Sequence, residues 1–159
     1  MPSLTIGPSG RLTMLFTDIE RSTQMLEVLG NEKYGLALAD HRRICREAFE
    51  RFGGTEVDTQ GDSFFVVFER AVDAAAAAEH AQAALGTIAV RVRMGLHTGN
   101  PVVSDGMYVG LDVHRAARIA AAAHGCQIVA SAASAAELIG NPGLVSLGNA
   151  AWAIRHVAD

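Results

Sequence analysis

Lysine is nearly absent from this chain of 159 residues. Of its 13 basic residues only Lys33 is a lysine, which leaves twelve arginines. A role that needs a lysine amine therefore has one candidate. The formal net charge is −4, so the chain lacks the basic excess that binds nucleic acid or an anionic membrane surface. We expect neither as a partner, and a polyanionic substrate would need local positive charge, most simply from metal ions.

Cysteines and long apolar runs are also scarce. Cys45 and Cys126 show no CxxC or CxH spacing, which is typical of a reduced, cytoplasmic chain. No window approaches about 18 uninterrupted apolar residues, and the N-terminus lacks the features of a signal peptide. We expect a flexible leader at residues 1–10 and a single domain at 11–159, because half of the residues are hydrophobic.

Strand and helix patterns alternate along that domain. The expected strands cover residues 12–16, 55–59, 63–68, 90–99 and 126–130, with weaker candidates at 144–147 and 152–157. The expected helices cover residues 22–29, 34–52, 71–85, 109–124 and 131–139. Residues 100–108 are expected to form a loop.

This order, βααββαβ followed by αβα, predicts an α+β fold with a ferredoxin-like βαββαβ core and a C-terminal extension. In that topology the strand that begins at Ser63 pairs antiparallel with the strand that ends at Phe16. The start of one then lies beside the end of the other, so Asp18 and Asp62 become neighbours.

Two carboxylates brought this close repel each other unless a cation lies between them or one is protonated. Magnesium or manganese is the usual cation, and a pair of such ions suits phosphoryl transfer. The alternative is that Asp18 caps the helix that follows it and Asp62 forms an Asx turn.

A second pair of polar residues lies on the predicted helix 109–124. His114 and Arg118 are four residues apart and project from one face. Arginine offers a fixed fork of donors for phosphate oxygens, although an arginine on a solvated helix face is the simpler interpretation. The other histidines show no HExxH spacing, and no GxxxxGK[ST] phosphate loop is present.

Four ordered motifs lie in residues 15–23, 60–64, 93–99 and 113–119: LFTDIERST, QGDSF, RMGLHTG and VHRAARI. In order and spacing they resemble the catalytic domain of class III nucleotidyl cyclases, of the actinobacterial type. The resemblance covers about residues 11–131.

The resemblance implies a metal site and a reaction. Asp18 and Asp62, with the backbone carbonyl of Ile19, would bind two Mg²⁺ or Mn²⁺ ions per site, and Arg118 would steady the triphosphate in the transition state. The ribose 3′-oxygen of a nucleoside triphosphate would attack the α-phosphorus, giving a 3′,5′-cyclic nucleotide and pyrophosphate. Family members form head-to-tail homodimers, in which one subunit supplies the metal carboxylates and the other the base-reading and transition-state residues.

The chain departs from the family at three of the six usual functional positions. Asp58 replaces the lysine that reads adenine, Met107 replaces the aspartate that pairs with it, and His114 replaces the transition-state asparagine. Lys33 is poorly placed to substitute. The tail after residue 148 is also short and lacks the expected basic run.

We therefore predict a class III cyclase with weak or conditional activity, on ATP by family default and with GTP possible. One rival is an inactive pseudo-cyclase that serves as a dimerisation or nucleotide-sensing module. Another is a diguanylate cyclase or polymerase-palm relative, which shares the strand-end carboxylates but lacks the motif at 113–119.

Overall fold

A computed structural model gives the structure of the chain and describes residues 10–155. Apart from Gly10, the predicted leader lies outside these residues, as does the end of the last predicted strand. The elements in chain order are β1 (Leu12–Ile19), α1 (Ser22–Leu29), α2 (Asn31–Arg51), β2 (Thr55–Gln60), β3 (Ser63–Phe68), α3 (Ala71–Leu85), β4 (Val92–Gly99), β5 (Val102–Ser104), β6 (Met107–Val109), α4 (Leu111–Ala122), β7 (Ile128–Ser131), α5 (Ala132–Ala136), β8 (Leu144–Gly148) and β9 (Ala151–Ile154).

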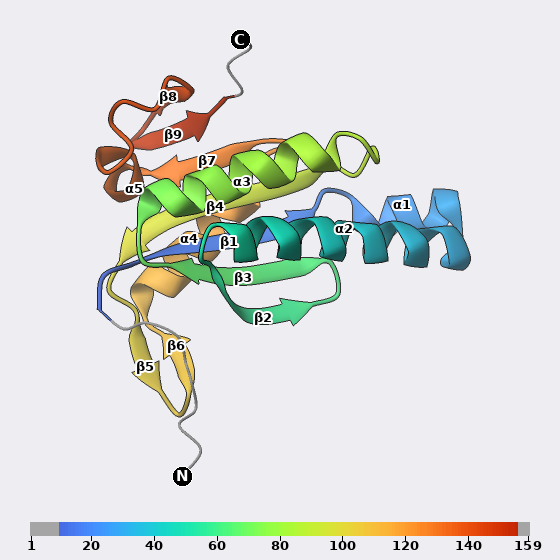
Figure 1. Ribbon diagram of the computed structural model, residues 1–159, viewed down its shortest axis with the longest axis horizontal. Helices are drawn as coiled ribbons and strands as arrows, with labels where there is room; N and C mark the ends of the chain where they lie inside the picture. Colours follow the sequence, from blue (N-terminus) through green and yellow to red (C-terminus); the bar gives the residue numbers. More distant parts are fainter. Residues whose placement is uncertain (1–9, 156–159) are drawn as a thin grey trace.

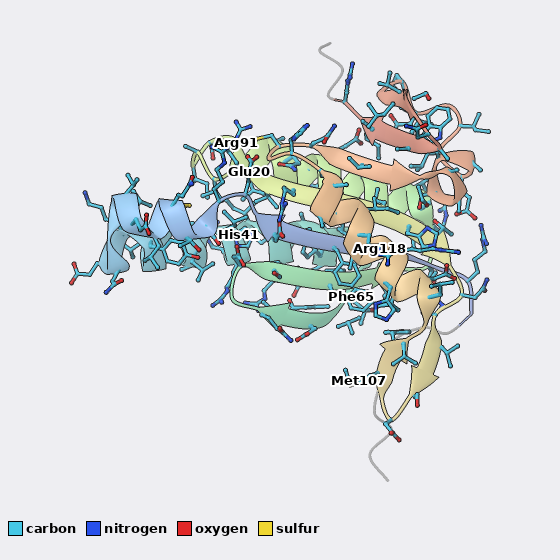
Figure 2. The ribbon with its side chains drawn as sticks, turned by 180° about the vertical axis from the view of Figure 1, so that it is seen from behind. Glu20, His41, Phe65, Arg91, Met107 and Arg118 are labelled. Carbon is cyan, nitrogen blue, oxygen red and sulfur yellow. The ribbon has the colours of Figure 1, made fainter. Side chains whose placement is uncertain are left out.

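One central sheet organises the molecule, with the strand order β2-β3-β1-β4-β7-β9-β8. Its first four strands, with the helices between them, form the predicted ferredoxin-like core, and β7, β9 and β8 extend the sheet. Helices α2 and α3 cover one face, and α4 packs against β4 and β1 on the other (Figures 1 and 2). The predicted α+β fold is confirmed.

The continuous apolar sequence of β3 follows from this layering, because helices lie on both faces of the sheet. Residues 64–68 of β3 are all buried. The larger core lies under α2 and α3, where the small side chains of α3 let this helix approach the sheet closely. Its fully buried alanines are Ala74, Ala77, Ala78 and Ala81. A smaller cluster on the opposite face joins Met14 and Val67 to Ala116 of α4.

The predicted loop at residues 100–108 is wrong in one respect, since it contains a two-stranded hairpin, β5 and β6. Asp105 and Gly106 join its strands with positive φ angles of 50° and 77°. A positive φ at both central positions of a tight hairpin turn favours the sequence Asp-Gly. The strands escaped prediction because each is only three residues long.

Several predicted boundaries also shift: β1 continues past residue 16 to Ile19, α2 begins at Asn31 instead of residue 34, β4 begins at Val92 instead of residue 90, and α4 covers Leu111–Ala122 instead of 109–124. The strand expected from Cys126 begins at Ile128, because Cys126 has a φ of 69° and cannot extend it. Helix α5 ends at Ala136 instead of residue 139. Within residues 10–155, the helices lack the combination of length and apolar character that crossing a membrane requires.

Candidate active site

The candidate site lies where β1 ends between its two neighbours in the sheet. The pairing of β1 with β3 ends at Thr17 and Phe64, and extending this register by one residue would place Asp18 opposite Ser63, next to Asp62. On its other side, Asp18 is paired directly with Arg93 of β4. The expected strand register is confirmed, and it brings both aspartates to one edge.

Asp18 is held by a bidentate ion pair. Nε of Arg93 donates to Oδ1 of Asp18 and Nη2 donates to Oδ2, each at 2.6 Å. The hydrogen bonds with Asp18 raise the pKa of Arg93, and the charges of Glu20 and Asp62 act in the same direction. Sequence reasoning gave Arg93 no role of its own.

The turn that carries Asp62 is fixed by helix α2. Nη2 of Arg42 donates to the carbonyl oxygen of Gly61 at 2.6 Å. The neighbouring His41 is fully buried against Phe64, with no hydrogen-bond partner for either ring nitrogen. Burial lowers the pKa of His41 to about 4, although the charge of Asp62 opposes this shift. The imidazole beside this turn is therefore neutral at pH 7.

The available donors suit a hard divalent cation. Two carboxylates and a backbone carbonyl are oxygen ligands, and magnesium is commonly held by one or two carboxylates together with substrate phosphates. The described part of the chain has no cluster of three or more His, Cys, Asp or Glu side chains arranged for a metal. Binding by Asp18, Asp62 and Ile19 thus stays a prediction, with further ligands expected from the substrate.

A shallow pocket of about 210 Å³ lies beside this edge. Its lining residues are Phe16, Asp58, Gln60, Ser63, Phe64 and Phe65. The rings of Phe16 and Phe65 stack with their centroids 4.3 Å apart, and Nε2 of Gln60 donates to Oδ2 of Asp58 at 3.0 Å. The pocket therefore combines aromatic surface with a carboxylate acceptor, which suits a base that presents N–H groups.

The structure does not place Met107 among the residues that line this pocket. Met107 lies on β6, is 64% exposed, and sits on the hairpin that projects from the sheet (Figure 2). Its neighbour Tyr108 is buried and packs edge-on against Phe65, with ring centroids 6.3 Å apart. The hairpin is thus anchored near the pocket while Met107 stays available on its surface.

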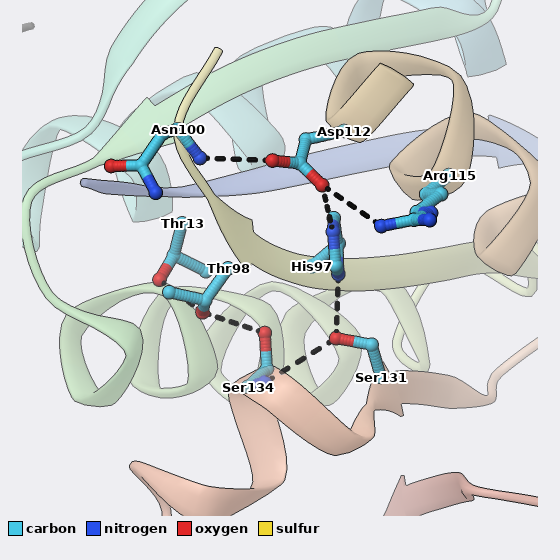
Figure 3. A network of polar contacts seen from close by, with 8 residues as sticks. All are labelled: Thr13, His97, Thr98, Asn100, Asp112, Arg115, Ser131 and Ser134. Atoms are coloured by element: carbon cyan, nitrogen blue, oxygen red, sulfur yellow. Dashed lines mark hydrogen bonds and ion pairs between the residues drawn. The ribbon is translucent and has the colours of Figure 1, made fainter. Parts of the chain in front are cut away.

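His114 and Arg118 are both exposed on α4, as Figure 2 shows for Arg118. A polar network holds the first turn of that helix (Figure 3). The ring of His97 is within hydrogen-bonding distance of Ser131 Oγ (2.7 Å) and Asp112 Oδ1 (2.8 Å), and the backbone N–H of Asn100 donates to Asp112 Oδ2 at 3.0 Å. The His97 bond lowers the pKa of Asp112. β4 and β7 thereby fix the helix that carries both residues.

Comparison with known proteins places this geometry in a family. The model of the adenylate and guanylate cyclase catalytic domain matches residues 4–144. The chain belongs to this family. The resemblance predicted from the four motifs is confirmed, and the site residues of this cyclase domain stay predictions.

Relatives and solved structures agree with this assignment. An uncharacterised protein of Mycobacterium tuberculosis is 38% identical over 131 residues, covering 81% of this chain and 45% of the relative, which fits the actinobacterial type. An adenylate cyclase of Neurospora crassa is 34% identical over 155 residues, covering 78% of this chain and 7% of that protein. This chain thus spans less than half the length of either relative.

The fold is shared with an adenylate cyclase of Trypanosoma brucei that was solved in its monomeric state. The TM-score is 0.82 at 22% sequence identity, covering 98% of this chain and 96% of the other. At this identity the likeness concerns the fold.

Proposed function

We propose that this cyclase domain is a metal-dependent enzyme of intracellular signalling, located in the cytoplasm. It converts a nucleoside triphosphate, with ATP as the family default and GTP as the alternative, to a 3′,5′-cyclic nucleotide and pyrophosphate. The observation that carries the proposal is the position of Asp18 and Asp62 at one edge of the sheet, in a chain that belongs to the cyclase family. We expect the activity to be low or conditional.

In the proposed site, Asp18, Asp62 and the carbonyl of Ile19 hold two Mg²⁺ or Mn²⁺ ions. When bound, these ions would favour loss of the 3′-hydroxyl proton to solvent and would neutralise the leaving pyrophosphate. The 3′-oxygen forms a bond to the α-phosphorus as the bond to the pyrophosphate oxygen breaks. Arg118 donates to phosphate oxygens as their charge shifts, and His114 supports the same contacts less well than an amide would. Asp58 accepts from N–H groups of the base.

The proposed assembly is a head-to-tail homodimer, in which Asp18 of one subunit meets Arg118 of the other. Arg118 is exposed on α4 and so is available to a second subunit. The hairpin and the start of α4 carry exposed apolar side chains, which an interface would cover. They are Val102 (59% exposed), Val103 (38%), Met107 (64%), Val109 (40%) and Leu111 (64%).

A second candidate function is that of an inactive pseudo-cyclase, a dimerisation or nucleotide-sensing module. It is favoured by Asp58, Met107 and His114, which stand where the resemblance to class III cyclases implies a lysine, an aspartate and an asparagine. A turnover assay with Mn²⁺ and either ATP or GTP separates the two candidates. A cyclic product supports the enzyme, whereas nucleotide binding without product supports the module.

Complementation tests the shared site. Asp18→Ala and Arg118→Ala chains, each inactive alone, should regain activity when mixed, because one of the two composite sites then has both residues. Arg115→Ala provides a control, since Arg115 is also exposed on α4 and forms an ion pair with Asp112 at 3.5 Å. We expect it to keep most of the parent activity. Failure of the mixed chains to recover, once heterodimers are demonstrated, would show that each subunit works alone.

A further inference from the structure

The guanidinium of Arg93 donates hydrogen bonds to both oxygens of Asp18, the carboxylate that is proposed to bind metal. Its Nε and Nη2 bond the two oxygens of Asp18, and its Nη1 donates to the carbonyl oxygen of Ala121 near the end of α4 at 3.2 Å. The two charged side chains are only 28% and 30% exposed. Every nitrogen of the fork and both carboxylate oxygens are therefore engaged.

The sheet itself creates this contact. Asp18 and Arg93 face each other across the antiparallel pair of β1 and β4, where the Cβ atoms of opposed residues lie about 4.5–5.5 Å apart. The planar fork of arginine matches a carboxylate at that separation. The bond to Ala121 fixes the fork from a second direction, so the pairing does not depend on a loop.

A divalent cation cannot simply be added to this arrangement. Magnesium binds its oxygen ligands at about 2.0–2.1 Å, so a metal on either lone pair that the fork leaves free on Asp18 would lie close to the positive guanidinium. Like charges at this distance repel. A metal on Asp18 and the guanidinium of Arg93 therefore oppose each other, and metal binding is favoured when Arg93 moves away from Asp18.

Without metal, the positive charge of Arg93 offsets the repulsion between the carboxylates of Asp18 and Asp62. Asp18 and Asp62 both lie within the electrostatic reach of Arg93, and two neighbouring carboxylates repel unless a cation is near. We propose that Arg93 is a built-in counter-ion of the metal-free site and competes with the divalent metal for Asp18, so that it sets the metal concentration at which the site fills. This inference rests on the proposed metal role of Asp18 and Asp62.

The chain offers a matched control for this competition. Arg91 lies two positions earlier in the sequence and also pairs with a carboxylate, since its Nε is 3.0 Å from Oε2 of Glu20 (Figure 2). Arg91 is more exposed, at 63%. Arg93→Met and Arg91→Met each remove one positive charge and one ion pair, but only the first frees Asp18.

The test is Mn²⁺ binding to the full chain without nucleotide, measured by electron paramagnetic resonance of free Mn²⁺. Arg93→Met should bind Mn²⁺ about tenfold more tightly than the parent, because the metal no longer meets a positive guanidinium on Asp18. Arg91→Met should stay within about threefold of the parent, since an exposed pair contributes little. Arg93→Lys, which keeps the charge but loses the fork, should fall between the parent and Arg93→Met and serves if the methionine variant fails to fold.

Three results would overturn the inference. The affinity could be unchanged or weaker in folded Arg93→Met, it could rise equally in Arg91→Met, or the increase could persist when Asp18→Ala is added to Arg93→Met. Failure of the proposed function gives a different result. If the chain binds Mn²⁺ as described but forms no cyclic product from ATP or GTP, the competition between Arg93 and the metal is supported and the proposed cyclase activity is wrong.

Discussion

Replacing Gly95 by alanine should force α4 away from the sheet. Gly95 lies in β4 beneath this helix, and a Cβ built there would be 2.3 Å from the backbone nitrogen of Ala120 and 2.6 Å from its Cα. These atoms belong to the helix backbone, so no side chain can rotate out of the way. To restore a separation of about 3.5 Å, α4 has to shift by roughly 1 Å.

The expected cost follows from that shift. Overpacking a well-filled core costs about 1–3 kcal/mol, and a displaced backbone places Gly95→Ala toward the upper part of this range. Gly35→Ala is the matched control, because Gly35 lies on the exposed side of α2 with no atom within 4 Å of the added Cβ. There the same substitution should stabilise the protein by about 0.5–1 kcal/mol, since alanine favours a helix interior.

Urea unfolding followed by circular dichroism measures both effects, and they should have opposite signs. If the parent chain turns over substrate, Gly95→Ala should also lower kcat at temperatures where it stays folded, because the shift moves Arg118 on α4. A Gly95→Ala chain as stable as the parent, beside a stabilised Gly35→Ala, would refute the close packing of α4 on β4.

Two further predictions concern a buried group and the base pocket. Because burial lowers the pKa of His41 from 6.5 to about 4, the unfolded chain takes up this proton first as the pH falls, and the free energy of unfolding should decrease by about 2 kcal/mol between about pH 7 and pH 5. The free energy of unfolding of His41→Leu, measured by denaturation, should lack most of this decrease. His80→Gln, a change at an exposed histidine, should retain it. Equal pH dependence in both variants would contradict a buried, neutral His41. In the pocket, the triple change Asp58→Lys, Met107→Asp and His114→Asn should raise the rate with ATP relative to GTP, because the lysine donates to adenine N1 and the aspartate accepts from its amino group. A parent that already prefers ATP strongly, with no gain in the triple variant, would show that the pocket reads the base in another way.

Much of the fold was predictable because local patterns decide it. Gly30 correctly marked the end of α1 at Leu29, and the alanine-rich stretch predicted α3 with its observed bounds, Ala71–Leu85. The two short strands of the β5–β6 hairpin carry too few residues for a period-2 pattern, although their Asp-Gly turn was a usable signal. For the site, the residue types and the βαββαβ order were enough to predict that Asp18 and Asp62 share an edge.

The family, the layers of the fold and the end of the sheet that carries the aspartates were thus predictable from the order of the residues. The contacts of the aspartates became visible only in the folded chain. Arg93 bonds Asp18 across a separation of 75 residues, and Phe16 meets Phe65 to form the pocket wall beside Asp58. These contacts depend on which residues of distant strands face each other, since a register shift of one residue would turn each side chain to the opposite face of the sheet. Many contacts between the paired strands set that register together, so no short stretch of the sequence predicts it.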